Sequence, residues 1–513
     1  MSFIRSAVTV GSGTLLSRVL GFVRDILIAA MLGAGPLADA FFVSFRLPNL
    51  FRRLFAEGAF NSAFVPLFAG KLAHDGAEEA KLFAEQSLSV LLAILFILTI
   101  LAEIFMPGLM YLLAPGFADD TDQFANVVLF GRIMFPYLLF VSLVALYGGM
   151  LNSLMQFAAA ALTPVLFNCI LIVALAVIIP VFGWPGETLS WAVAVAGVAQ
   201  FLMLVVVASR SDMRLRLRWP RLTPDVKRLL ALTGPGAISG GIAQINLFIG
   251  TIIASLHAGA VSYLYYADRL YQVPLSAIGT AIGVVLLPDL SRRLREGNEA
   301  GALWSLNRAL EFGLLLTVPA ALALLIIPGQ IVDVMFTRGA FTQADANATA
   351  MAAAGFAIGL PAYVLIKIFS PAFYSREDTM TPLKFAAAGV VLNIILSVGL
   401  YFWIGFISIA IATSVAAWLN AGLLWFSLKR QGHMQLDEQS AIRLPRIALS
   451  CAVFSVTLWA GAALLSPWLV ANAGVAGMAA LAALVLGGIG VFGVMCHFSG
   501  AITLGELRAS LRR

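Results

Sequence analysis

The stretch SRVLGFVRDILIAAMLGAGPLADAFFVSFRLPNLFRRLFAE, residues Ser17–Glu57, is mostly apolar and yet carries eight charged side chains. The whole chain of 513 residues is 61% hydrophobic and 11% charged, whereas soluble domains are about a quarter charged. A transmembrane helix needs about 20 mostly apolar residues, and the apolar runs here are well beyond the ~10 residues of a barrel strand. The sequence therefore predicts an all-α integral membrane protein, in which the charges of Ser17–Glu57 need an explanation.

Clusters of polar, glycine and proline residues divide the chain into about 14 predicted transmembrane helices. Their approximate ranges are 7–32, 37–68, 82–113, 125–154, 160–182, 188–209, 227–256, 260–290, 302–327, 346–374, 380–403, 405–428, 445–468 and 473–498. Lysine and arginine gather in alternate loops, and the loops between carry almost none except Arg338. This pattern predicts that both termini are cytoplasmic. The net charge of +6 is then explained by topology, and no nucleic-acid partner is expected.

Short similarities within the chain indicate an internal repeat. The segment AMLGAG at 30–35 recurs as ASLHAG at 254–259, an offset of 224 residues, and three weaker pairs have similar offsets. We predict two pseudo-symmetric six-helix lobes, 1–215 and 216–430, related by an axis along the membrane normal, as in transporters that move one lobe against the other. Residues 431–513 are predicted to add a linker, two further helices and a basic cytoplasmic tail.

The charges inside predicted helices are expected to face water, one another or a ligand, because each costs about 2.5–3.5 kcal/mol at the bilayer centre. Arg18 and Asp25 are seven residues apart and therefore lie on one side of a helix. Asp268 and Arg269 place further charges in the second lobe. The candidate residues around a central cavity are Arg18, Arg24, Arg52, Arg53 and Arg269, with the acids Asp25, Asp39, Glu57 and Asp268.

The surplus of arginine favours an anionic, phosphate-bearing ligand, because a guanidinium matches phosphate geometry and stays charged when buried. A cation exporter would instead need buried carboxylates. A structural explanation stays open for several of these residues. Arg53 and Glu57 can neutralise each other four residues apart, Arg52 can extend to the interface, and Arg24 and Asp25 can pair with other helices.

No cofactor is expected from the sequence. The histidines lack metal-ligand spacing, and no nucleotide-binding motif occurs, so ATP is not expected to drive the protein. The membrane potential, worth about 2.3 kcal/mol per charge per 100 mV, is a plausible driver, and a coupling ion is the alternative.

Five segments resemble the MurJ (MviN) family of lipid II flippases, within the multidrug/oligosaccharidyl-lipid/polysaccharide (MOP) superfamily. They are SRVLGFVRD (17–25), ADAFFVSFRLPNLFRRLFAEGAFNSAFVP (38–66), APGF (114–117), YYADRLYQVP (265–274) and FYSREDTMTP (373–382). The resemblance covers essentially the whole chain. It implies two six-helix lobes around a cationic cavity, a groove for a lipid tail beside the last two helices, and alternating access. Helix bending at glycine and proline positions is an alternative to lobe rotation.

The resemblance also implies a function in peptidoglycan biosynthesis, and hence in cell-wall biogenesis and cell shape. A multi-pass protein of the bacterial cytoplasmic membrane, expected to be a monomer among phospholipids, would move lipid II to the outer leaflet. Lipid II is undecaprenyl diphosphate linked to MurNAc-pentapeptide and GlcNAc. The alternatives are a flippase for another polyprenyl-diphosphate-linked glycan or a multidrug/cation antiporter. A membrane glycosyltransferase would need a catalytic carboxylate, for which the loop at 114–123 offers only acids typical of a solvated surface.

The resemblance assigns roles by position. Arg18, Arg24 and Arg269 match the family's essential cavity arginines. Asp39 matches an acid at the periplasmic mouth, and Asp25 belongs to the gate. The charges of the second helix, Arg52, Arg53 and Glu57, match the cavity and portal. A sodium site of some relatives needs acids in the seventh and eleventh helices, which hold Asp225 and Asn393 here, so no metal is expected.

Overall fold

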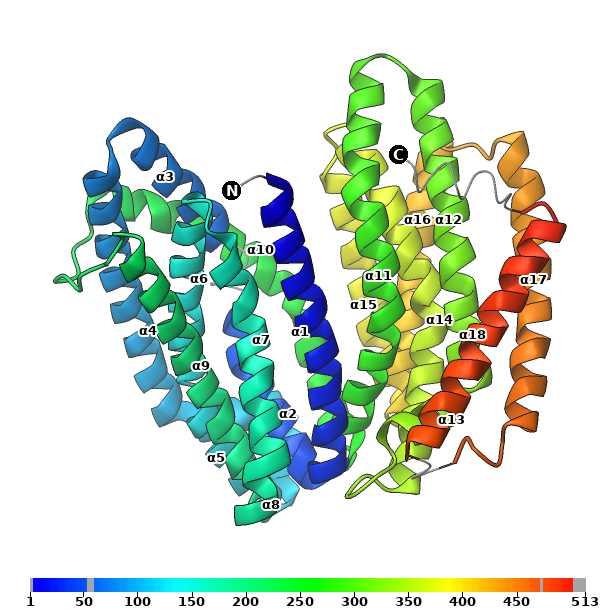
Figure 1. Cartoon of the computed structure of the whole chain (residues 1–513), viewed down its shortest axis with the longest axis horizontal. Coiled ribbons are helices and arrows are strands. Elements are labelled where there is room, and N and C mark those ends of the chain that lie inside the picture. The colour runs from blue at the N-terminus through cyan, green and yellow to red at the C-terminus, as the bar shows by residue number, and fades with distance from the viewer. Residues whose placement is uncertain (1–2, 53–59, 471–473, 502–513) are drawn as a thin grey trace. The chain divides into compact units, whose positions relative to one another are not determined.

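The structure, a computed structural model, describes residues 3–52, 60–470 and 474–501, and these ranges contain helices and no strand (Figure 1). The helices of the first half are α1 (Phe3–Leu32), α2 (Pro36–Phe51), α3 (Asn61–His74), α4 (Ala77–Leu113), η2 (Pro115–Asp119), α5 (Thr121–Met134), α6 (Tyr137–Ser153), α7 (Phe157–Val173), η3 (Ala174–Ile178), α8 (Ile179–Phe182), α9 (Pro185–Arg210) and α10 (Pro224–Ser255). Those of the second half are α11 (Ala260–Arg295), α12 (Glu299–Ile326), α13 (Pro328–Phe336), α14 (Gln343–Tyr374), α15 (Met380–Ile404), α16 (Ile407–Arg430), α17 (Glu438–Leu464) and α18 (Gly474–Phe498). The all-α prediction is confirmed.

Over the described residues, each predicted span coincides with one helix or with consecutive helices that share it. Within the described ranges, ten segments are long and apolar enough to cross a membrane. The helices α1, α2, α3, α10 and α11 are not among those ten, and three of these, α1, α2 and α11, carry candidate site charges. The total of 14 transmembrane helices therefore stays a prediction.

Proline marks many of the helix boundaries. Pro36, Pro185, Pro224 and Pro328 each open a helix, a position where the missing backbone N–H leaves no hydrogen bond unmade. Pro136 lies between α5 and α6, so that the predicted span 125–154 is divided into two consecutive helices. These boundaries are readable from sequence because they depend on local backbone chemistry.

The chain divides into two compact units, Met1–Ser262 and Tyr263–Arg513. The first unit includes α10, although the sequence repeat places this helix in the second lobe. Lys71 on α3 lies 2.9 Å from Asp225 on α10, and Thr223 donates a hydrogen bond to Gln86 on α4 at 3.0 Å. The hydrogen bond to Asp225 raises the pKa of Lys71. These contacts join α10 to the first unit.

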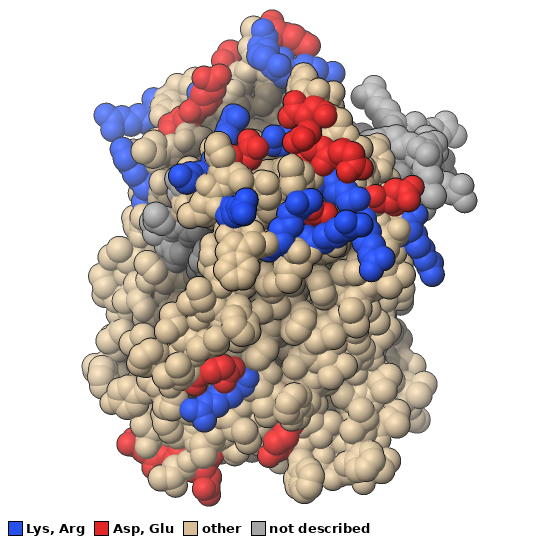
Figure 2. Space-filling view, turned by 90° about the vertical axis from the view of Figure 1, so that its left-hand side faces the viewer, with Lys and Arg blue, Asp and Glu red and all other residues tan. Residues whose placement is uncertain are grey.

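A basic connecting segment, residues 211–223, is also fixed to the first unit. The buried carboxylate of Glu85 on α4 accepts from the Arg216 backbone N–H at 2.9 Å and from Arg218 Nε at 2.5 Å. Ser89 accepts from the Arg218 backbone N–H at 3.0 Å. In Figure 2, charged side chains gather toward one end of the first unit's visible face, and a broad apolar belt lies beside them. This distribution is what a membrane-embedded helical unit requires.

In the second unit, a polar network anchors the start of α17 to α12. Arg308 donates to both carboxylate oxygens of Asp437, at 2.8 and 2.7 Å, and to Glu311 at 2.8 Å. Ser440 and Arg443 on α17 donate to Glu311 at 2.7 and 3.3 Å. Although partial burial alone would raise the pKa of Asp437, hydrogen bonds from Ser440 and the Arg308 charge outweigh it and hold that pKa below its ordinary value.

Arg338, the arginine that departs from the loop charge pattern, has a local structural role. Its Nη2 donates to the backbone carbonyls of Val334 and Met335 at 2.6 and 2.9 Å. These carbonyls belong to the last turn of α13, where helix carbonyls lack intrahelical partners and a cation is favoured. Arg338 therefore caps a helix.

We predict that Asp437→Asn lowers the free energy of unfolding by about 1–3 kcal/mol at pH 7, because it weakens charged hydrogen bonds to Arg308. Since the pKa of Asp437 is lowered in the folded state, its contribution is present above the ordinary pKa of about 3.9 and is lost as the pH falls through the folded-state value. Thermal unfolding of the purified variant and wild type, at pH 7 and in acid, measures the difference.

The control for this prediction is Asp212→Asn, the same chemical change at an exposed acid. It should leave the unfolding temperature unchanged at both pH values. An Asp437→Asn variant as stable as wild type at pH 7 would show that the network does not anchor α17.

Candidate functional site

Arg24 on α1 is held by neighbouring groups of the first unit. Its Nε and Nη2 donate to Asp25 Oδ1 at 3.0 and 2.6 Å, and its Nη1 donates to Asn168 Oδ1 on α7 at 2.9 Å. The Asn168 amide donates in turn to the backbone carbonyl of Ser17 at 3.0 Å. Arg24 also lies over the ring of Phe167, 5.9 Å from its centre. The guanidinium is thus oriented by a carboxylate, an amide and an aromatic face.

Asp25 is 2% exposed and accepts from Arg24 in this buried position. The sequence analysis left open that Arg24 and Asp25 pair with other helices. The structure pairs them with each other and adds Asn168, a neutral residue 144 positions away from Arg24. Sequence reasoning missed Asn168, since an asparagine in an apolar helix carries no charge signal.

The polar residues of α2 follow its helical repeat. Arg52 Nε donates to Asn49 Oδ1 at 3.1 Å, and Asn49 donates to the Phe45 carbonyl at 2.9 Å. Arg46, six residues before Arg52, contacts α10, where its Nη1 donates to Thr251 Oγ1 at 2.5 Å. Arg46 was outside the predicted site set, although its three-residue spacing from Asn49 was a signal for it.

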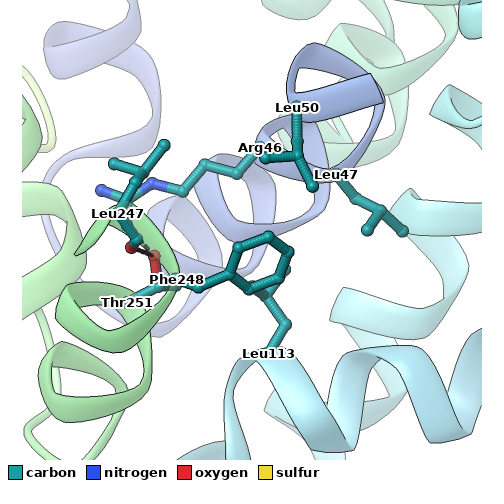
Figure 3. A pocket seen from close by; sticks show the side chains of 7 residues that line it. All are labelled: Arg46, Leu47, Leu50, Leu113, Leu247, Phe248 and Thr251. Carbon is teal, nitrogen blue, oxygen red and sulfur yellow. Dashed lines mark hydrogen bonds between the residues drawn. The ribbon is translucent and has the colours of Figure 1, made fainter. Parts of the chain in front are cut away.

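A small cavity of about 10 Å³ lies beside the Arg46 contact. Figure 3 shows its lining, which is apolar apart from Arg46 and Thr251 and comes from α2, α4 and α10: Arg46, Leu47, Leu50, Leu113, Leu247, Phe248 and Thr251. A space of this volume holds at most about one water molecule. It is therefore a packing feature of the first unit and is far too small for a lipid-linked glycan.

Asp39 on α2 is fully buried, and its carboxylate accepts hydrogen bonds from backbone N–H groups at the start of α11. Its carboxylate accepts from the backbone N–H of Gly259 at 2.7 Å, from the backbone N–H of Ser262 at 2.8 Å and from the Ser262 hydroxyl at 2.5 Å. Helix N-terminal N–H groups lack intrahelical partners and favour a negative charge. Asp39 therefore fixes the start of α11.

The remaining predicted residues of the first unit are Arg18, Arg53 and Glu57. Arg18 is exposed on α1. Arg53 and Glu57 lie outside the described residues, so their predicted roles stay predictions.

The second unit holds Asp268 and Arg269 on α11. Gln272 donates to Asp268 Oδ2, and the Arg269 guanidinium lies 4.7 Å from the centre of the Tyr265 ring. Both residues are half-buried. The arginine is thus oriented by an aromatic face, as Arg24 is in the first unit.

Asp225 and Asn393, the two residues that the sequence analysis considered for a sodium site, make other contacts here. Asn393 on α15 donates to Thr413 at 3.0 Å and accepts from Ser397 at 3.1 Å, and Asp225 pairs with Lys71. Among the residues that the structure describes, no three metal-binding side chains form a group.

Comparison of the sequence with known proteins assigns the chain to a family. The sequence model of the family described as lipid II flippase MurJ matches residues 28–476. The chain belongs to the MurJ family. A relative from Rhizobium meliloti, named a probable lipid II flippase MurJ, is 45% identical over 522 residues, which cover 100% of this chain and 96% of the relative. The lipid II flippase MurJ of Burkholderia cenocepacia is 37% identical over 442 residues, 85% of each chain.

Solved structures show the same fold. A lipid II flippase MurJ in an inward closed conformation is 25% identical with a TM-score of 0.79, covering 96% of this chain and 98% of that one. An inward-facing multidrug resistance MATE family transporter of the MOP superfamily is 16% identical with a TM-score of 0.68, covering 83% and 98%, which shows the fold alone. The predicted family is confirmed, and the chain is a multi-pass transporter of the bacterial inner membrane.

We predict that Asp39→Asn lowers the unfolding temperature more than Ser262→Ala. The amide presents an N–H₂ group to N–H donors and leaves a buried backbone donor unsatisfied, at a cost of about 1–3 kcal/mol. The serine variant removes one hydroxyl and leaves both backbone donors paired with the carboxylate. Thermal unfolding in one detergent compares the two variants, and a larger loss for Ser262→Ala would contradict the capping role.

Proposed function

We propose that this chain moves lipid II from the inner to the outer leaflet of the cytoplasmic membrane by alternating access. The observation that carries the proposal is the match to the lipid II flippase family over residues 28–476, together with the oriented guanidinium of Arg24 inside an apolar unit. A partly buried arginine such as Arg24 is costly in a membrane, and its guanidinium matches a diphosphate. The reaction is transport, and no covalent step is proposed.

The substrate's diphosphate is proposed to bind a cationic cavity of Arg18, Arg24, Arg52, Arg53 and Arg269. The contact of Arg24 with Asp25 supports an exchange mechanism. With no phosphate bound, the Asp25 carboxylate balances the guanidinium at 2.6 Å. The oxygens of a diphosphate can accept the same Arg24 N–H groups and carry more charge, and a diphosphate can replace Asp25 while Asn168 keeps the guanidinium oriented.

The acids Asp25, Asp39, Glu57 and Asp268 are proposed as gate and charge partners. An acid released from its arginine needs another partner, so substrate binding changes the relative stability of the conformations. This matters because a ligand shifts a conformational equilibrium only through different affinities for the two states.

The membrane potential is the proposed driver, and a coupling ion is the alternative. Outward movement of negative charge across an inside-negative membrane is favourable by about 2.3 kcal/mol per charge per 100 mV. Transport of a diphosphate can therefore proceed without ATP.

The remaining architecture is proposed from the sequence. The repeat lobes are 1–215 and 216–430, the segment 431–513 supplies α17 and α18 as a groove for the prenyl tail, and both termini are cytoplasmic. The anchoring of α17 through Asp437 and Glu311 supports a fixed position for this groove on the second unit. The chain is proposed to act as a monomer among phospholipids.

The test is rescue of a bacterial strain depleted of its own lipid II flippase, with lipid II exposed on the outer leaflet as the readout. Wild type should restore exposure. Arg24→Ala and Arg269→Ala should fail at matched membrane expression, because each removes a cationic group that binds the diphosphate. Cys169→Ala, an exposed neighbour of Asn168 on α7, is the control and should rescue fully.

Asn168→Ala should give partial rescue, since Arg24 keeps its charge and its Asp25 contact but loses one of the three groups that orient it. Full rescue by the arginine variants would assign these residues to structure alone. Failure of the wild type in a host that accepts other family members would favour a different polyprenyl-linked glycan as substrate.

A further inference from the structure

Lys367 on α14 is a charged residue that neither the predicted site nor the proposed mechanism uses. Asp345 and Lys367 are the charged residues of α14, and Asp345 lies in its first turn. The Lys367 side chain is exposed, and within the described residues it makes no hydrogen bond or ion pair. Lys367 lies seven residues before the end of α14, and a cation at this position in an apolar helix is costly and calls for a ligand.

Lys367 lies on the side of α14 that packs against α11, opposite an exposed apolar residue. Ile358, 44% exposed, is nine residues from Lys367 and so lies on the opposite side of the helix. Tyr363 is four residues away, on the Lys367 side. Its ring lies 5.9 Å from that of Tyr271 on α11. Lys367 therefore shares a side with the polar and aromatic contacts to α11.

The backbone of α11 makes room for the lysine at Gly279. A Cβ atom at this position would lie 2.6 Å from Lys367 Cδ and 2.8 Å from its Nζ. The side chain thus lies across α11 against the glycine, where an alanine could not be accommodated without moving the lysine. The position of the amine is set by packing within the second unit.

The amine is remote from both the cytoplasmic charges and Arg269. Gly279 is ten residues from Arg269 and ten from Asp289, about 15 Å along the helix in each direction. Asp289 is paired with Arg292 and Arg293 at 3.0 and 2.8 Å. A snorkelling lysine would extend toward the charged cluster of Asp289, Arg292 and Arg293. Lys367 does not, because its amine lies beside Gly279.

We propose that Lys367 binds the terminal carboxylate of the substrate's peptide while Arg269 binds the diphosphate. This inference rests on the proposed function. A diphosphate is much shorter than the ~15 Å between Arg269 and the position of Lys367 beside Gly279. One diphosphate therefore cannot contact both side chains. A five-residue peptide extends to about 17 Å and ends in a carboxylate, which an ammonium group binds through a charged hydrogen bond.

The test measures binding of two ligands to the purified full-length chain: lipid II, and undecaprenyl diphosphate without sugar or peptide. Lys367→Met should weaken lipid II binding about tenfold or more, the effect of one charged hydrogen bond, and leave undecaprenyl diphosphate binding unchanged. Arg269→Met should weaken both. Lys384→Met, the same change at an exposed lysine of α15, should weaken neither.

Two further measurements separate the amine from the fold. Gly279→Ala keeps the charge but displaces the lysine, so it should weaken lipid II binding in a wild-type background and have no added effect with Lys367→Met. Lipid II with an amidated peptide terminus should bind wild type as weakly as normal lipid II binds Lys367→Met.

The outcomes are distinct. A Lys367→Met variant that binds lipid II as wild type does would overturn the inference and leave the proposed function intact. Equal weakening of both ligands would also overturn it, since Lys367 would then bind the diphosphate. A wild type that fails to bind lipid II would overturn the proposed function, and this inference with it.

Discussion

The cost of placing charge in hydrocarbon organises this structure. Each charged side chain within an apolar helix is unfavourable by several kcal/mol unless it is paired, hydrogen-bonded or exposed to water. Arg24 has a carboxylate and an amide as partners, and the buried Asp39 accepts three hydrogen bonds. The charges outside these helices need no such arrangement, and many are exposed at the surface.

The same constraint separates two kinds of buried polar contact. The network of Arg308 and Arg443 with Glu311 and Asp437 pairs two cations with two carboxylates and joins α12 to α17, so it is a structural anchor. The contact of Arg24 with Asp25 joins adjacent residues of one helix, whereas the contact of Arg24 with Asn168 joins α1 to α7. The pair within one helix is the one at which we propose that a ligand replaces the carboxylate.

Glycine and aromatic residues complete the arrangement of the cations. Arg24 and Arg269 each lie over an aromatic ring, which limits the orientations of a guanidinium without removing its hydrogen-bond donors. Lys367 is placed instead by the absence of a side chain at Gly279. Orientation by neutral groups leaves the positive charge available to an anion, whereas orientation by carboxylates alone would neutralise it.

The sequence by itself determined the helical class, the approximate helix ranges and the unusual arginines, because apolar run length and the cost of intramembrane charge are local properties. It also indicated the family through the motif of the second helix. Only the tertiary structure decided the partners: Asn168 for Arg24, Thr251 for Arg46, the start of α11 for Asp39, and Gly279 for Lys367. These partners are neutral or distant in the chain, so no charge pattern or periodicity marks them. The assignment of α10 to the first compact unit likewise depends on contacts across helices, which a sequence repeat does not encode.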